Sequence, residues 1–226
     1  YGIPAATFVG GFAVAKLLGF TQIESMAALT SAACCIGGIG GLSSQTTARL
    51  GNVLGMSGVS FGIAATLGSL PPSPAVFAQF LGLAGIGGMV GYKIAEKVGP
   101  TELPQTVAAF HSLVGLAAVG TAVGDYLLHM TDPELMDAIR STSIYLATFI
   151  GGVTATGSLT AFGKLLGMLS SKPLALPFRD NLNIGLGVLS LANLALFVAA
   201  PTASWASIPL LTTVAASGVL GAHMTA

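Results

Sequence analysis

"TVAAFHSLVGLAAVGTAV", residues 106–123, is an apolar run that contains a single ionisable side chain, His111. The hydrocarbon core of a bilayer is about 30 Å thick, and an α-helix of about 17 to 25 apolar residues crosses it. The run is long enough for such a crossing. It therefore predicts a transmembrane helix with an imidazole inside the membrane, and that placement has to be explained.

The composition of the whole chain agrees with this prediction. Of its 226 residues 53% are hydrophobic and 7% are charged, which is too little polar surface to cover a soluble globule. The formal net charge is zero, so the chain lacks the basic surface that nucleic-acid binding requires. Cys34 and Cys35 are adjacent in an apolar run, and neither a disulfide nor a metal site is expected from them.

Other apolar segments of comparable length are separated by short connections that hold most of the prolines and charges. Short connections make consecutive helices antiparallel neighbours. We predict an all-α fold, a polytopic transmembrane helix bundle of about eight spans. The expected spans are Pro4–Phe20, Ile23–Leu42, Leu50–Leu70, Ala75–Tyr92, Leu103–Leu128, Ile144–Gly163, Leu182–Ala200 and Ile208–Met224.

The basic residues support this span count. If the spans alternate in direction, six basic residues fall on one side of the membrane and only Lys16 and Arg140 fall on the other, which assigns the first side to the cytoplasm or matrix. Tyr145 and Trp205 are expected to anchor the opposite interface. The charges of the basic side form either a solvated face or a docking surface for a soluble partner: Arg49, Lys93, Lys97, Glu102, Lys172, Arg179 and Asp180.

Glycine is abundant, with 31 residues, and six pairs have the small-xxx-small spacing that lets membrane helices approach closely. We therefore expect a bundle packed tightly through Gly, Ala and Ser. The pairs are Gly37 and Gly41, Gly51 and Gly55, Gly58 and Gly62, Gly87 and Gly91, Gly120 and Gly124, and Gly163 and Gly167.

His111 is the leading candidate for chemistry. It lies eight residues into its span, which at 1.5 Å per residue places it about 12 Å deep. Small residues at helical spacing surround it, so we expect the ring to face the bundle interior. Imidazole gains and loses a proton near neutral pH, and ionisable residues inside membranes are functional by default. The alternative is a neutral histidine satisfied by a neighbouring hydroxyl.

Other polar residues of the spans are weaker candidates. Ser112 follows His111, and Thr154 and Ser158 offer hydroxyls on a second small-residue stripe that could order water beside the ring. Asp125 and His129 form an i, i+4 pair at the far end of the same helix, either as a proton mouth or as solvent-facing charges. His223 lies near the basic side, as an exit or as an interface residue.

Four segments in order carry a family resemblance: "SSQTTARLGNVLGM", "TELPQTVAAFHSLVGLAAV", "TFIGGVTATGSLTAFGKL" and "SSKPLALPFRDNLN". They resemble the membrane domain of proton-translocating nicotinamide nucleotide transhydrogenase, from about Ser25 to Ala226. The resemblance implies that His111 is the intramembrane proton-relay histidine. It also implies hydride transfer from NADH to NADP on soluble domains, coupled to proton movement through the membrane domain.

The resemblance further implies that residues 1–226 form an incomplete membrane domain. In the family two more helices follow, one with a channel asparagine, and NAD and NADP bind to separate soluble domains. We therefore expect no cofactor or metal in this chain and no hydride transfer by it alone. The partners implied are the lipid bilayer, the NAD-binding and NADP-binding domains and a second copy in a homodimer.

Two alternatives to this function remain open: a fragment of a secondary transporter or channel, and a structural subunit of a respiratory assembly. The apolar sequence from Pro4 to Leu42 is continuous, as in fused forms of the family. This favours the mitochondrial inner membrane, with a bacterial cytoplasmic membrane as the alternative.

Overall fold

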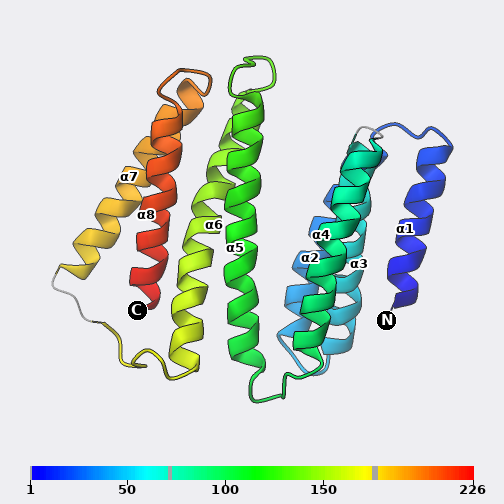
Figure 1. The fold of residues 1–226 in the computed structure, drawn as a ribbon, viewed down its shortest axis with the longest axis horizontal. Coiled ribbons are helices and arrows are strands. Elements are labelled where there is room, and N and C mark those ends of the chain that lie inside the picture. The colour runs from blue at the N-terminus through cyan, green and yellow to red at the C-terminus, as the bar shows by residue number, and fades with distance from the viewer. Residues whose placement is uncertain (1, 71–72, 175–177) are drawn as a thin grey trace. The chain divides into compact units, whose positions relative to one another are not determined.

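A computed structural model describes residues 2–70, 73–174 and 178–226, and every regular element in these ranges is an α-helix. The helices follow one another through short connections (Figure 1). This confirms the all-α fold predicted from the sequence. The helices are α1 (Gly2–Leu17), α2 (Ile23–Leu42), α3 (Ala48–Ser69), α4 (Pro74–Ala95), α5 (Leu103–His129), α6 (Ala138–Leu165), α7 (Arg179–Ala199) and α8 (Ser207–Thr225).

Seven of the described helices, α2 to α8, are long and apolar enough to cross a membrane, so the chain is a multi-pass membrane protein. The remaining helix, α1, has 16 residues, and at 1.5 Å per residue it is about 24 Å long. It was expected to reach Phe20 but ends at Leu17, where Gly19 takes a left-handed backbone conformation with φ of 76°. A glycine in this conformation just beyond the last turn is a common helix stop.

Helix α6 begins at Ala138, earlier than the expected Ile144, and its start has a clear cause. The side chain of Asp137 accepts a hydrogen bond from the backbone N–H of Arg140 at 2.7 Å, which caps the first turn. Capping satisfies an amide that the helix itself leaves unpaired. The helix therefore includes Ser141 and its polar neighbours, which hydropathy alone had excluded.

The chain divides into two compact units, Tyr1–Val90 and Gly91–Ala226, and each is described separately. In the first unit α2 and α3 pack through glycine. A Cβ placed on Gly41 would lie 2.7 Å from the Cα of Gly51, so the two backbones touch where side chains are absent. Helix α1 packs on α3 through Phe12, whose ring centroid lies 6.1 Å from that of Phe61.

In the second unit α5 packs on α6, α6 packs on α8, and α7 packs chiefly on α8. Figure 1 shows α5 to α8 running alternately up and down, from green to red. A Cβ on Gly115 of α5 would lie 2.5 Å from the Ala155 nitrogen of α6, and a Cβ on Gly221 of α8 would lie 2.8 Å from the Cα of Val153. The predicted packing through small residues is thus present in both units, but not at the pairs Gly87 and Gly91 or Gly120 and Gly124, where an added Cβ would meet nothing within 4 Å among the described residues.

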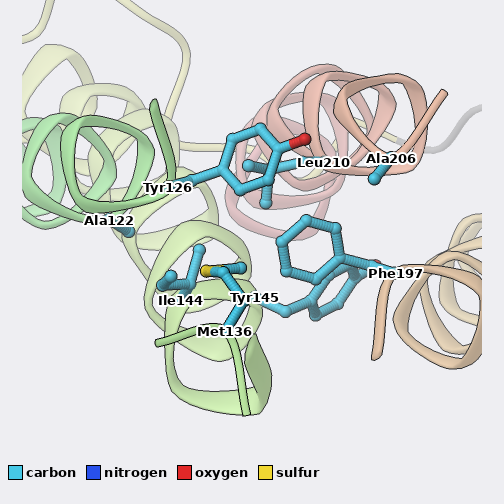
Figure 2. Close-up of a cluster of buried hydrophobic side chains, with 8 residues drawn as sticks. All are labelled: Ala122, Tyr126, Met136, Ile144, Tyr145, Phe197, Ala206 and Leu210. Carbon is cyan, nitrogen blue, oxygen red and sulfur yellow. The ribbon is translucent and has the colours of Figure 1, made fainter. Parts of the chain in front are cut away.

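The apolar core of the second unit lies at the end where α5 turns into α6 and α7 turns into α8. Figure 2 shows the Tyr126, Tyr145 and Phe197 rings gathered there from three helices. The ring centroids of Tyr126 and Phe197 are 5.3 Å apart in an edge-to-face arrangement that aromatic pairs prefer. Tyr145 is buried, so the expectation that it anchors the membrane interface is wrong; Trp205 is exposed.

Candidate functional site

His111 lies on α5 and is exposed within the described structure. Its Nδ1 is 2.9 Å from the carbonyl oxygen of Val107, one turn earlier in the same helix. A carbonyl only accepts hydrogen bonds, so this contact places the proton of a neutral ring on Nδ1 and makes Nε2 the acceptor. The imidazole is therefore oriented by its own helix, with Nε2 available to a proton donor.

The expectation that His111 faces the bundle interior is wrong for the described helices. The buried line on α5 passes through Ser112, Gly115, Ala122 and Tyr126. Consecutive residues of an α-helix point about 100° apart. Ser112 therefore occupies the contact with α6, and the ring of His111 leaves the helix beside that contact.

The structure does not bring the expected hydroxyls onto His111. Ser112 is buried, and Thr154 and Ser158 are half-buried on α6. Among the described residues no hydrogen bond joins the imidazole to any of the three. On this stretch of α6 it is the hydroxyl of Thr156 that bonds to another helix, donating to the carbonyl oxygen of Gly218 on α8 at 2.7 Å.

Near the C-terminal end of α5, Asp125 forms an ion pair with Arg140, which was not among the candidate site residues. Arg140 donates from Nε to Oδ2 at 3.0 Å and from Nη2 to Oδ1 at 2.7 Å. Two parallel bonds of this kind are the strong geometry for a guanidinium and a carboxylate. The available signal was the short α5–α6 connection, which returns Arg140 to the level of Asp125.

His129 completes this cluster, which consists of Asp125, His129 and Arg140. Its Nδ1 lies 3.2 Å from Oδ1 of Asp125 and 3.2 Å from Nη2 of Arg140. The same nitrogen lies 2.9 Å from the Asp125 carbonyl oxygen. Arginine only donates, so Nδ1 must accept a hydrogen bond to bind Arg140 and must carry a proton to bind the carbonyl. One nitrogen cannot do both at once. The pair predicted from its i, i+4 spacing exists, and Arg140 converts it into a triad.

His223 is buried, so it does not sit at an exposed interface. Its Nδ1 lies 2.8 Å from Oδ1 of Asn183 on α7. Its Nε2 is buried and has no hydrogen-bond partner among the described residues. The pair joins α8 to the first turns of α7, which begins at Arg179.

The charges of the basic side remain largely exposed. Lys93 pairs with Glu96 at 3.2 Å, and Glu102 accepts a hydrogen bond from the backbone N–H of Gly99 at 3.3 Å. Lys97, Lys172 and Asp180 are exposed and Arg179 is half-buried; Arg49, in the first unit, is exposed. The described residues contain no group of three His, Cys, Asp or Glu side chains placed to hold a metal ion.

These features define a class of protein: a polytopic helical membrane protein whose spans pack through glycine and carry imidazoles within them. The family follows from comparison with known sequences. The chain belongs to the NAD(P) transhydrogenase beta subunit family, whose family model matches residues 24–226.

Curated relatives agree with this family. The chain is 40% identical over 165 residues to NAD(P) transhydrogenase subunit beta of Rhodospirillum rubrum. That match covers 67% of this chain and 34% of the relative, and the same protein from a named strain of the bacterium gives the same values. The chain thus spans about a third of the length of these relatives.

Proposed function

We propose that this chain is the proton-translocating membrane part of an NAD(P) transhydrogenase. In this role it links hydride transfer between NADH and NADP, which takes place on partner soluble domains, to proton movement across an energy-coupling membrane. Membership of the beta subunit family supports the transhydrogenase role. The chain spans about a third of the length of these relatives, and we assign the nucleotide chemistry to soluble domains of the full-length enzyme, as the family resemblance implies.

The observation that carries the proposal is the environment of His111. Its ring lies within a 27-residue apolar helix, and its Nδ1 is bound to the carbonyl oxygen of Val107. A side chain that contacts only lipid would gain nothing from an ionisable ring, since polar groups in hydrocarbon are costly. We propose that in the full-length enzyme protein or water covers this face of α5, and that Nε2 exchanges the translocated proton there.

Coupling requires the soluble domains to respond to the protonation of His111. A partner shifts an equilibrium between two states only if it binds them with different affinities. The exposed charges Lys97, Lys172 and Asp180 support docking of a soluble NADP-binding or NAD-binding domain at the basic side. The homodimer implied by the family resemblance remains part of this proposal.

The unbroken helices weigh against the alternative of a transporter fragment. Secondary transporters typically bind solutes at helices interrupted near the membrane midplane. Within the described ranges, α2 to α8 each run continuously from end to end. A purely structural subunit remains the alternative that the experiment below has to exclude.

The proposed location is a membrane that maintains a proton gradient. The curated relatives named above come from a bacterium, which supports the bacterial cytoplasmic membrane over the mitochondrial inner membrane.

The test uses the full-length enzyme in sealed proteoliposomes, with proton uptake followed while NADH reduces an NADP analogue. His111→Ala should lower uptake at least tenfold, whereas cyclic hydride exchange between bound nucleotides should persist. Leu113→Ala is the matched control, because Leu113 is an exposed apolar residue of the same helix. Normal uptake by His111→Ala would exclude the relay and favour the structural alternative.

A further inference from the structure

The imidazole of His223 has one satisfied nitrogen and one that is buried without a partner. The residue is 8% exposed, and Nε2 has no hydrogen-bond partner in the described part of the chain. Buried polar atoms are almost always paired, and an exception calls for a specific cause such as an ordered water or a functional role. A tightly packed histidine with an open nitrogen is therefore a candidate site in its own right.

The partner of the other nitrogen determines what Nε2 can do. Nδ1 lies 2.8 Å from the amide oxygen of Asn183, an acceptor, so the proton of a neutral ring sits on Nδ1. Nε2 then presents a lone pair. When Nε2 takes up a proton, Nδ1 keeps its bond to Asn183, so the same contact holds the ring in both protonation states.

The surroundings fix this imidazole at one end of the second unit. The chain carbonyl of Ala226, three residues after His223, accepts hydrogen bonds from Nζ of Lys164 at 2.5 Å and from the backbone N–H of Leu174 at 3.0 Å. Lys164 belongs to α6, so the end of α8 is tied to both α6 and the connection that follows it. His223 thus lies one turn before a point where α8 is bonded to α6.

Among the described residues no charged group of the packed elements reaches Nε2. On α6 the charged group at this end is Lys164, which donates a hydrogen bond to Ala226; Arg140 lies at the other end of α6. On α7 Arg179 is half-buried and Asp180 is exposed, both in the turn before Asn183. No carboxylate of the described residues forms a hydrogen bond or a salt bridge with His223, so a water molecule or hydronium is the donor whose chemistry fits Nε2.

We propose that His223, positioned by Asn183, is a second proton-carrying imidazole that binds a water molecule at Nε2 near the basic side of the membrane. It takes a proton from a hydronium at Nε2 and returns it to water from the same atom, so no other bond changes. This inference rests on the proposed proton translocation. It assigns a proton position on α7 and α8, separate from His111 on α5.

The experiment uses the full-length enzyme in proteoliposomes and compares His223→Gln with wild type. Glutamine can still contact Asn183 but cannot carry a proton. Proton uptake should fall at least tenfold, while cyclic hydride exchange and the thermal midpoint stay close to wild type. Met224→Leu is the matched control, because Met224 is the exposed apolar neighbour of His223. Undiminished uptake by His223→Gln overturns the inference and leaves the proposed function intact.

A second variant separates proton carriage from packing. Asn183→Asp keeps an oxygen acceptor for Nδ1 and adds a negative charge that favours the protonated ring. The pH at which proton uptake is half-maximal should therefore rise. If His223→Gln also lowers the thermal midpoint, an unchanged pH profile in Asn183→Asp overturns the inference. If the wild-type enzyme takes up no protons, the proposed function fails together with this inference.

Discussion

Arg140 donates two hydrogen bonds, 3.0 Å and 2.7 Å long, to the carboxylate of Asp125 across the hairpin formed by α5 and α6. About a third of each side chain is exposed, so the pair lies between the surface and buried extremes. Surface pairs contribute about 0 to 1 kcal/mol, whereas breaking a buried pair costs about 3 to 5 kcal/mol. The pair closes the end of the hairpin opposite the basic side.

Asp125→Asn is expected to lower the free energy of unfolding by about 1 to 2 kcal/mol, because Arg140 is left half-buried without a counter-charge. The measurement is denaturant unfolding in detergent micelles. The swap of Asp125→Arg with Arg140→Asp should recover most of the loss. Ile139→Ala is the control, since Ile139 is exposed. Equal unfolding of Asp125→Asn and wild type would show that the pair contributes nothing.

The close approach of α5 and α6 at Gly115 gives a packing prediction. Gly115→Ala places a methyl group 2.5 Å from the nitrogen of Ala155, and the two backbones must separate to admit it. Overpacking of this kind costs about 1 to 3 kcal/mol. Gly120→Ala on the same helix is the control, since its Cβ would meet nothing within 4 Å among the described residues. A thermal midpoint lowered equally by both variants would contradict the prediction.

Span identity could be predicted from the sequence because hydropathy and length are local properties. Ile23–Leu42 is reproduced residue for residue, and the helix with His111 begins at the expected Leu103. The early start of α6 could not be predicted from hydropathy, because it depends on capping by Asp137. The paired state of Arg140 likewise depends on the geometry of a hairpin that composition does not describe.

The direction of individual side chains was harder to predict than their depth. Depth follows from counting residues, which placed His111 well inside its span. The direction in which the His111 side chain points depends on which side of α5 packs on α6. That side is set by the contact of Gly115 with Ala155. The sequence left two interpretations of His223 open, an exit and an interface residue. Only the tertiary structure shows that it is buried beside Asn183.

Tyr145 was expected at the membrane interface, yet its hydroxyl is buried between three helices. Oη lies 2.5 Å from the carbonyl oxygen of Ser190 on α7 and 2.6 Å from Oγ1 of Thr213 on α8. These partners are 45 and 68 residues away in sequence, beyond the reach of any local pattern. The side chain therefore links α6 to both later helices through one polar atom.

Tyr145→Phe removes this atom, so the Ser190 carbonyl loses a hydrogen bond and the Thr213 hydroxyl keeps only its contacts with the Pro209 carbonyl oxygen and Asn193 Nδ2. The expected loss is about 0.5 to 1.5 kcal/mol in the free energy of unfolding, the usual net contribution of a hydrogen bond. Tyr92→Phe is the control, because Tyr92 is exposed. In a double-mutant cycle, Thr213→Val should cost less in the Tyr145→Phe background than in wild type, since the shared bond is already gone. Strictly additive losses would mean that the two hydroxyls do not stabilise each other and that the loss in Tyr145→Phe comes from the hydrogen bond to the Ser190 carbonyl.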